Sequence, residues 1–300
     1  MPNPSEWDRR LKSFSKNIGL IERAPLMNKV AVIVEPRISE VLTDLLRWML
    51  FLLAPVGWKF IVYAGTRNSK QMHELVETLD VADILEVREL NTDNLTIRDY
   101  NVMLTSKSFW EEMPFENILI FQTDTLLLDS NLDVFLEYDY VGAPWNKNLG
   151  WLHSSEHVTG NGGLSLRTKS GMLRALETFA YDGANEDIFF CGCRDTLNIA
   201  PCDVAMKFSI ESVFYETPKG FHKCWEHLSF EEMQKVYAYI DSVLSKTESK
   251  SIARWRSHVA VEGLVVRFRP SKPAVGNSPP FYAPQTNILE GRTNAWEFVI

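Results

Sequence analysis

Apolar strand-like segments alternate with amphipathic helical segments from residue 29 onward, and this alternation limits the possible folds more than any other feature. Residues 29–35 (KVAVIVE) and 59–65 (KFIVYAG) have the short apolar composition of buried strands. Between them, residues 40–53 place apolar side chains at helical spacing, and Ser39 is the expected N-cap. This β-α-β order predicts a mainly parallel sheet covered by helices.

The same alternation continues as far as residue 131. The next expected elements are a helix over 69–79, a strand over 83–90, one helix over 96–113 that Pro114 ends, and a fourth strand over 116–131. Four strands with intervening helices predict an α/β domain with a Rossmann-like sheet.

The fourth strand, ENILIFQTDTLLLDSN, contains a polar break at residues 122–125. A carboxylate such as Asp124 within an apolar strand must be hydrogen-bonded, paired with a cation or bound to a metal. Two interpretations stay open. Asp124 is either a structural aspartate that caps a neighbouring loop, or a ligand for Mn²⁺ or Mg²⁺ that would clamp the phosphates of a bound nucleotide.

The composition of the chain changes after residue 138. Residues 138–167 are rich in Gly, Asn, Trp and Ser, which is typical of loops that carry sites. Beyond these loops we expect a helix over 168–180, a helix from Asn185 and a strand over 206–211. A helix from 229 to about 244 should follow, with Ser229 and Glu232 as its capping box. The rest is expected to be a connector over 246–251, a strand or hairpin over 258–270 and an extended tail from 271. We therefore predict an N-terminal arm (1–28), a catalytic domain (29–228) and a C-terminal helix with an extended tail (229–300).

Polar residues follow the expected strands at the points where they end. Glu35 and Arg37 follow the first strand, residues 65–68 follow the second, and Gln122, Thr123 and Asp124 lie in the fourth. Ligands gather at the carboxyl ends of strands in open α/β sheets, so these side chains are expected to meet. Taken singly, each is also explained as a solvated strand end or a surface ion pair.

Two later motifs add further candidates. In GNGGLSLR, Gly162 and Gly163 allow positive φ and close approach of the backbone to a ligand, and Asn161 can hydrogen-bond hydroxyl groups. In NEDIFF, Glu186 and Asp187 begin a helix, where they either stabilise its N-terminus or act as a general base or acceptor-binding carboxylate.

A third motif, GFHKCW, supplies His222 and Lys223, interpreted as a metal ligand and a phosphate contact or as a surface turn with a partly buried histidine. The cysteines are Cys191, Cys193, Cys202 and Cys224. Their spacing favours reduced thiols over a zinc site built with His222.

Charge and hydropathy limit the classes of partner. A net charge of -8 and an isoelectric point near 5.4 argue against a nucleic-acid-binding surface. Residues 48–58 are too short an apolar run to span a bilayer, and the N-terminus lacks the features of a secretory signal. We expect a cytoplasmic protein, in the host cytoplasm if its source is viral, without a transmembrane segment.

The ordered series FQTDTLLL, YDYVGAPW, GNGGLSLR, NEDIFF and GFHK, preceded by VAVIVEPR, resembles a largely uncharacterised glycosyltransferase-A-like family of giant viruses, fungi and bacteria. The resemblance covers roughly residues 29–225. It implies a glycosyltransferase-A fold and a hexosyl- or deoxyhexosyltransferase that moves a sugar from a nucleotide-sugar donor, UDP-linked as first choice, to a hydroxyl of a glycan, protein or small molecule.

The resemblance also implies roles for particular residues. Asp124 takes the place of the last aspartate of a D-x-D-like motif and would bind Mn²⁺ or Mg²⁺ with His222, whereas Gln122 departs from the first aspartate. Asp187 is the expected base, with Glu186 as second choice. The implied donor-binding set is Glu35, Arg37, Gln122, Thr123, Asp124, Asn161, Gly162, Gly163 and Lys223, and the implied acceptor-stacking set is Trp145 and Trp151, for which core or lid packing is the alternative.

Rival functions from other classes remain. A non-catalytic module of the same fold would bind a nucleotide or glycan without turnover. A nucleotidyltransferase would need a Gly-rich phosphate loop after the first strand, and VEPRISE contains none. The sequence leaves open the donor sugar, the acceptor, the oligomeric state and whether the anomeric configuration is inverted or retained.

Overall fold

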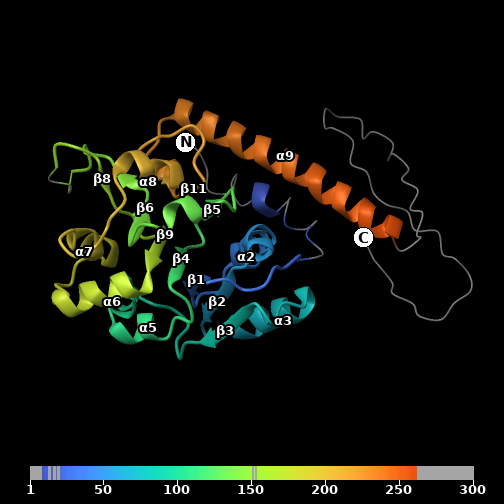
Figure 1. Cartoon of the computed structure of the whole chain (residues 1–300), viewed down its shortest axis with the longest axis horizontal. Coiled ribbons are helices and arrows are strands. Elements are labelled where there is room, and N and C mark those ends of the chain that lie inside the picture. Colours follow the sequence, from blue (N-terminus) through green and yellow to red (C-terminus); the bar gives the residue numbers. More distant parts are fainter. Residues whose placement is uncertain are drawn as a thin grey trace, which may run out of the picture. The chain divides into compact units, whose positions relative to one another are not determined.

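The fold is built on a six-stranded mixed sheet, as seen in the computed structural model, which describes residues 9–12, 15, 18, 21–150, 152 and 154–261 (Figure 1). Its strand order is β3-β2-β1-β4-β9-β6. The bounds are β1 (Lys29–Glu35), β2 (Lys59–Ala64), β3 (Leu85–Glu89), β4 (Asn117–Phe121), β6 (Tyr140–Gly142) and β9 (Leu164–Thr168). The strands β1 to β4 pair in parallel, and β9 is antiparallel to both of its neighbours. The predicted mainly parallel α/β sheet is confirmed.

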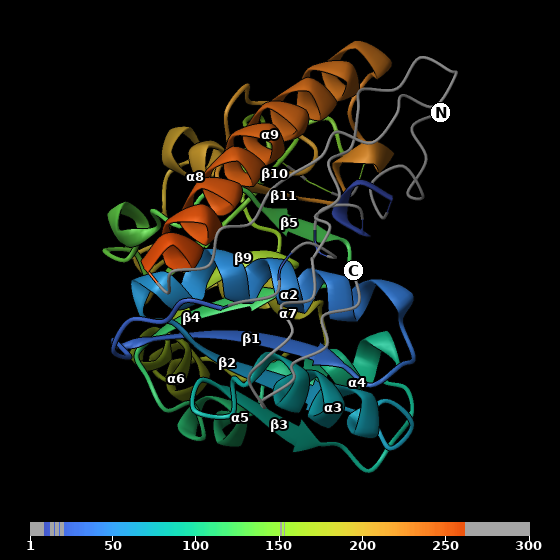
Figure 2. The same cartoon turned by 90° about the vertical axis from the view of Figure 1, so that its right-hand side faces the viewer.

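Helices cover both faces of this sheet (Figure 2). Because side chains alternate along a strand, Val30 and Val32 face one side, where they join a buried cluster with Trp110. That side carries α5 (Lys107–Glu111) and α6 (Lys169–Thr178), whereas α2 (Glu40–Leu53) lies on the other. The predicted helix over 40–53 is thus a core helix, although Ser39 makes no side-chain capping bond.

Smaller elements complete the described part of the chain. A three-stranded sheet has the order β10-β11-β5, and β7 pairs with β8. Their bounds are β5 (Thr125–Leu127), β7 (Pro144–Trp145), β8 (Val158–Thr159), β10 (Ser209–Ile210) and β11 (Gly220–His222); the helices are α3 (Ser69–Leu79), α4 (Ile97–Leu104), α7 (Glu186–Gly192), α8 (Cys202–Phe208) and α9 (Phe230–Val261), with short 3-10 turns η1 (Ala54–Val56), η2 (Asp133–Phe135) and η3 (Cys224–Glu226).

Three predicted elements were wrong in extent. The fourth strand is not continuous, because β4 ends at Phe121 and the chain turns before β5 joins the second sheet. The helix over 96–113 is two helices, since Ser106 caps the start of α5 by accepting from the backbone N–H of Phe109. The strand over 206–211 is mostly helical, because α8 continues to Phe208 and leaves only β10 extended.

The C-terminal region also departs from expectation. The Ser229/Glu232 capping box is confirmed. The helix that it begins runs to Val261, so the predicted connector over 246–251 is helical, and so is the start of the predicted strand or hairpin at 258. The tail from 271 lies outside the described residues. The chain divides into two compact units after Val243, and the predicted domain boundaries stay predictions. None of the helices in the described ranges is both long and apolar enough to cross a membrane.

The strand order creates a switch point between β1 and β4. From β1 the chain proceeds to β2 and β3 on one side, and it then returns to place β4 on the other side. The loops that leave β1 and β4 therefore diverge, and open α/β sheets bind ligands at such a crevice. Glu35 ends β1 and Gln122 follows β4, so the sheet brings these two predicted residues to the same edge.

Candidate active site

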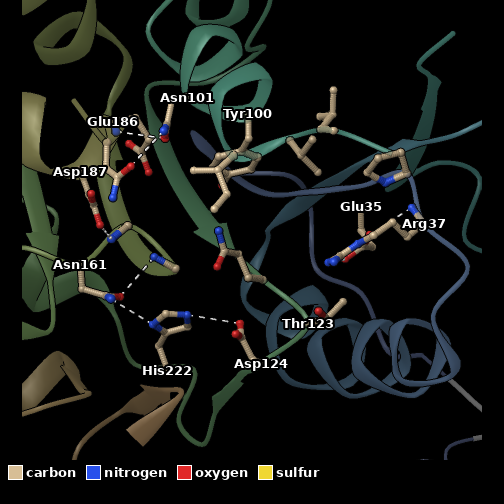
Figure 3. A pocket seen from close by; sticks show the side chains of 18 of the residues that line it. Glu35, Arg37, Tyr100, Asn101, Thr123, Asp124, Asn161, Glu186, Asp187 and His222 are labelled. Atoms are coloured by element: carbon tan, nitrogen blue, oxygen red, sulfur yellow. Dashed lines mark hydrogen bonds and ion pairs between the residues drawn. The ribbon is translucent and has the colours of Figure 1, made fainter. Parts of the chain in front are cut away.

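A cleft of about 310 Å³ opens at this edge of the sheet (Figure 3). That volume is enough for a sugar-sized ligand. The loops after β1 and β4, the loop before β9, the end of β11 and the starts of α4 and α7 contribute its walls. The predicted residues that line it are Glu35, Arg37, Gln122, Thr123, Asp124, Asn161, Gly162, Gly163, Glu186, Asp187 and His222.

Asp124 and His222 approach each other from two different elements. Asp124 lies in the turn between β4 and β5, and His222 ends β11, which pairs with β5. The Nε2 atom of His222 is 3.3 Å from Oδ1 of Asp124, and both atoms are buried without a hydrogen-bond partner. Such orphaned polar atoms are rare in proteins and call for an explanation.

The two side chains also shift each other's pKa. Burial lowers the pKa of His222, but the Asp124 and Glu211 carboxylates outweigh it and raise the pKa to about 9. Burial raises the pKa of Asp124, but its interaction with His222 outweighs this effect, and the pKa is lowered overall. Both shifts favour charged side chains at the bottom of the cleft.

Asp124 and His222 could hold a divalent cation if other molecules supplied its remaining ligands. Within the described ranges, no cluster of three or more Cys, His, Asp or Glu side chains is placed to hold a metal. Two ligands bound to one ion at right angles, each about 2.1 Å away, would be about 3 Å apart, close to the separation of Asp124 and His222. The buried oxygen is a suitable donor for Mn²⁺, and so is the nitrogen once its proton has left. Further donors would come from a bound diphosphate and water.

The GNGG loop is shaped by its neighbours. A β-carbon on Gly163 would collide with the His222 ring, and one on Gly162 would collide with the Glu186 carboxylate. Both glycines are therefore required for close packing. Neither glycine uses the positive φ that it allows, and the left-handed residue of this loop is Asn161, with φ of 51°.

Glu186 lines the cleft, but its carboxylate is held in a buried ion pair. Nη1 and Nη2 of Arg167 donate to its two carboxylate oxygens at 2.5 and 3.0 Å. The guanidinium also lies within 6 Å of the ring centroids of Tyr140, Trp110 and Phe190. The carboxylate of Glu186 is already paired, which argues against its second-choice role as base.

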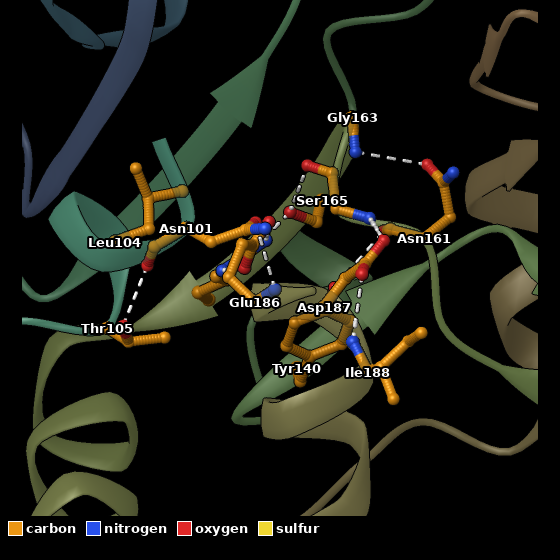
Figure 4. A network of polar contacts seen from close by, with 12 residues as sticks. Asn101, Leu104, Thr105, Tyr140, Asn161, Gly163, Ser165, Glu186, Asp187 and Ile188 are labelled. Atoms are coloured by element: carbon orange, nitrogen blue, oxygen red, sulfur yellow. Dashed lines mark hydrogen bonds and ion pairs between the residues drawn. The ribbon is translucent and has the colours of Figure 1, made fainter. Parts of the chain in front are cut away.

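Asp187 retains the properties of a base. Its Oδ2 accepts from the backbone N–H of Gly162 at 3.0 Å, and its Oδ1 accepts from that of Ile188 at 2.8 Å (Figure 4). Burial, followed by the nearby Glu186 charge, raises the pKa of Asp187 to about 6. A partly exposed carboxylate with this pKa can exchange a proton with a ligand near neutral pH.

Glu35 and Arg37 form the opposite wall of the cleft (Figure 3). Nε and Nη2 of Arg37 donate to the two Glu35 oxygens at 2.8 and 2.7 Å. The backbone after β1 is fixed by Asn68, whose Nδ2 donates to the carbonyl oxygens of both residues at 2.8 Å. Glu35 is buried whereas the Arg37 side chain is 62% exposed, so the guanidinium presents its unpaired edge to solvent and ligand.

Gln122 has a neighbour in the cleft, Tyr100, that was not predicted from the sequence. Tyr100 on α4 lines the same cleft, and burial raises the pKa of this tyrosine, whereas its contact with Gln122 opposes that rise. An amide can make this contact without adding a charge next to Asp124. Gln122 is therefore a lining group with a protein partner of its own.

Two other predicted residues, Lys223 and Trp145, stand apart from the cleft lining. Lys223 pairs its ammonium with Glu226 at 3.1 Å, and its backbone N–H donates to the Asp124 carbonyl oxygen at 3.0 Å. Trp145 is buried in β7 against Gly160, which favours core packing over stacking on a sugar. Trp151 lies outside the described residues. In the described part of the chain, the polar contacts of His222 are with Asn161, Glu211 and Asp124 rather than with a cysteine.

Four residues in or next to the cleft were not predicted from the sequence, namely Arg167, Glu211, Tyr100 and Asn101. Arg167 has a recognisable signal, because it ends the apolar strand pattern LSLR and a cation there needs a buried anion. Asn101, whose Oδ1 accepts from the Glu186 backbone N–H at 3.1 Å, is one polar residue on an amphipathic helix. Tyr100 and Glu211 have no comparable local signal, since only tertiary packing brings them to the cleft.

Comparisons with known proteins place this geometry in context. A family model described as "Protein of unknown function (DUF5672)" matches residues 84–222, a range that contains the cleft residues from Tyr100 to His222. No curated protein matches the chain.

Several solved structures are similar. The galactosyltransferase LgtC in complex with donor and acceptor sugar analogs has 10% identity and a TM-score of 0.44 over 72% of this chain and 95% of its own. The bifunctional glycosyltransferase WbbM has 8% identity and a TM-score of 0.44 over 72% and 45%. The 4-diphosphocytidyl-2C-methyl-D-erythritol synthase of Anaerococcus prevotii has 8% identity and a TM-score of 0.41 over 58% and 87%. Similarity at this level assigns no activity to the chain.

Proposed function

We propose that the protein is a glycosyltransferase that moves a sugar from a nucleotide-sugar donor, UDP-linked as first choice, to a hydroxyl acceptor with the help of Mn²⁺ or Mg²⁺. The observation that carries this proposal is the orphaned Asp124 and His222 pair at the switch point. It opens on the same cleft as Asp187, whose pKa of about 6 suits a base. The resemblance of the ordered sequence motifs to a glycosyltransferase-A-like family points to the same chemistry.

The proposed reaction needs one group that stabilises the leaving diphosphate and another that takes the proton of the acceptor hydroxyl. The bond between the anomeric carbon and the β-phosphate oxygen breaks, and the nucleoside diphosphate leaves with the electron pair. The acceptor oxygen forms the new bond to the anomeric carbon and gives up its proton. A divalent cation, when bound, neutralises negative charge on the leaving diphosphate.

The residues of the chain divide these tasks. Asp124 and His222 would hold the cation, and the exposed edge of Arg37 would contact a donor phosphate. Asp187 would bind the acceptor hydroxyl or take its proton, since Glu186 is committed to Arg167. Charge stabilisation and proton removal would then act from opposite walls of one cleft.

The test is release of nucleoside diphosphate or monophosphate from a panel of UDP-, GDP-, dTDP- and CMP-sugars with Mn²⁺. We expect release from one donor class, loss of at least 100-fold in Asp124→Asn, and no change in the surface control Glu137→Gln. NMR of the product would show inversion or retention. Binding of sugar nucleotides without any release across the panel would favour the non-catalytic binding module, and full activity of Asp124→Asn would remove that residue from the site.

A further inference from the structure

Glu211 is a buried carboxylate that reaches the cleft only through other residues. It follows β10, its side chain is 9% exposed, and it does not line the cleft. Its Oε1 accepts from Nδ2 of Asn161 at 2.7 Å and lies 3.1 Å from Nδ1 of His222. We infer that Glu211 is a positioning residue that fixes the His222 ring so that Nε2 faces Asp124 and, once its proton has left, can bind a divalent cation beside that carboxylate.

The contact with Glu211 determines which ring nitrogen carries the proton. A carboxylate only accepts hydrogen bonds, so an unprotonated Nδ1 at 3.1 Å would place two lone pairs against each other in a buried site. Nδ1 of His222 therefore carries a hydrogen and donates it to Glu211. Nδ2 of Asn161 donates to the same Glu211 oxygen and lies 2.9 Å from Nδ1 of His222. The two nitrogens are therefore neighbouring donors that share one acceptor.

The neighbouring backbone prevents the ring from turning away. Gly163 packs so closely against His222 that a β-carbon there would collide with the ring, and its N–H donates to Oδ1 of Asn161 at 3.2 Å. Asn161 is in turn held by the Tyr140 hydroxyl, which donates to its carbonyl oxygen at 3.1 Å. The ring is thus clamped between Glu211 on its Nδ1 side and Asp124 on its Nε2 side.

This arrangement is the one that a metal-binding histidine needs. Histidine ligands usually donate the N–H of the second ring nitrogen to a carboxylate, and loss of that partner weakens metal binding by about 10- to 100-fold. The inference rests on the proposed function, because it assumes that Asp124 and His222 bind a cation. Glu211 belongs to a different element, so it can be changed without altering either proposed ligand.

The experiment measures the Mn²⁺ dissociation constant from the EPR signal of free Mn²⁺, with and without UDP, and needs no turnover. In Glu211→Gln we expect a dissociation constant about 10-fold or more above wild type, whereas the exposed control Glu216→Gln keeps the wild-type value. A second variant, Glu211→Asp, keeps the charge but draws it away from Nδ1, and we expect it to remain impaired. Ring-nitrogen NMR of the wild-type protein with Mg²⁺ should find the proton on Nδ1 of His222 and none on Nε2.

The outcomes separate this inference from the proposed function. If Asp124→Asn weakens Mn²⁺ binding but Glu211→Gln does not, the positioning role fails and the cation site stands. Full recovery in Glu211→Asp would assign the effect to charge alone, and a proton on Nε2 of the Mg²⁺-bound ring would contradict the clamp even if the variants fail to fold. Absence of Mn²⁺ binding by the wild type, with and without UDP, would overturn both.

Discussion

The His222 ring occupies the space that a side chain on Gly163 would need. The glycine therefore limits where the imidazole can lie relative to Asp124. This relationship accounts for one of the two adjacent glycines in GNGG, and it can be tested by adding a single methyl group.

Gly163→Ala is expected to displace the imidazole and weaken Mn²⁺ binding by about 10-fold or more, because a shifted Nε2 can no longer share an ion with Asp124. Overpacking should also lower the free energy of unfolding by about 1–3 kcal/mol. The measurements are Mn²⁺ titration and urea denaturation. Gly192→Ala is the control, since a β-carbon there meets open space, and equal effects at the two positions would contradict the packing argument.

Asp187→Asn is expected to change the pH dependence of stability. The pKa of Asp187 is raised from 3.8 to about 6, so its contribution is fully present below pH 3.8 and is lost as pH rises through 6. The amide avoids this loss, so the stability of the variant relative to wild type should rise by about 3 kcal/mol between pH 3.5 and pH 7. Thermal melts between pH 3.5 and 8 provide the check. A difference that stays constant with pH would argue against a raised pKa.

Arg167→Met is expected to lower the free energy of unfolding by about 3–5 kcal/mol, because it leaves the Glu186 carboxylate buried without its partner. The double variant Arg167→Met/Glu186→Gln should recover part of that loss, since it removes the uncompensated charge. Arg174→Met is the matched control, because Arg174 pairs with Asp139 but is 45% exposed and should cost no more than about 1 kcal/mol. Urea denaturation of all variants would reveal whether burial makes the difference.

Gln122→Ala is expected to leave the Mn²⁺ dissociation constant within about threefold of wild type. Its side chain contacts Tyr100, and the two candidate cation ligands do not include it. Asp124→Asn, two residues away, should weaken binding by more than 10-fold in the same titration. Comparable losses in the two variants would make Gln122 a cation ligand.

The sequence predicted the sheet well because its strands follow local patterns. Residues 29–35 and 59–65 are apolar runs flanked by helical segments, and β1 and β2 formed where expected. The strand over 206–211 failed for the opposite reason, since its alternation was weaker than the tertiary context that extends α8 to Phe208. The tertiary environment also divided the apolar segment around Asp124 between two sheets.

The site residues show the same contrast between local sequence patterns, which can be predicted, and tertiary contacts, which cannot. Asp124, Asp187 and His222 were identifiable because charged or titratable groups next to apolar segments need an explanation, and the structure brings all three to one cleft. Glu211 was not identifiable, because its importance comes from a contact with a residue 11 positions away that only the second sheet creates. Contacts of this kind have no signature in a single sequence.

The break between β4 and β5 links ligand binding in the cleft to the local stability of the smaller sheet. The turn that carries Asp124 joins the six-stranded sheet to the three-stranded sheet, and His222 belongs to the latter. Any ligand that bridges Asp124 and His222 therefore connects the six-stranded sheet to the three-stranded sheet. Occupancy of the cleft should therefore slow amide hydrogen exchange in β5 and β11 far more than in β2 or β3, which makes the smaller sheet a built-in reporter of binding.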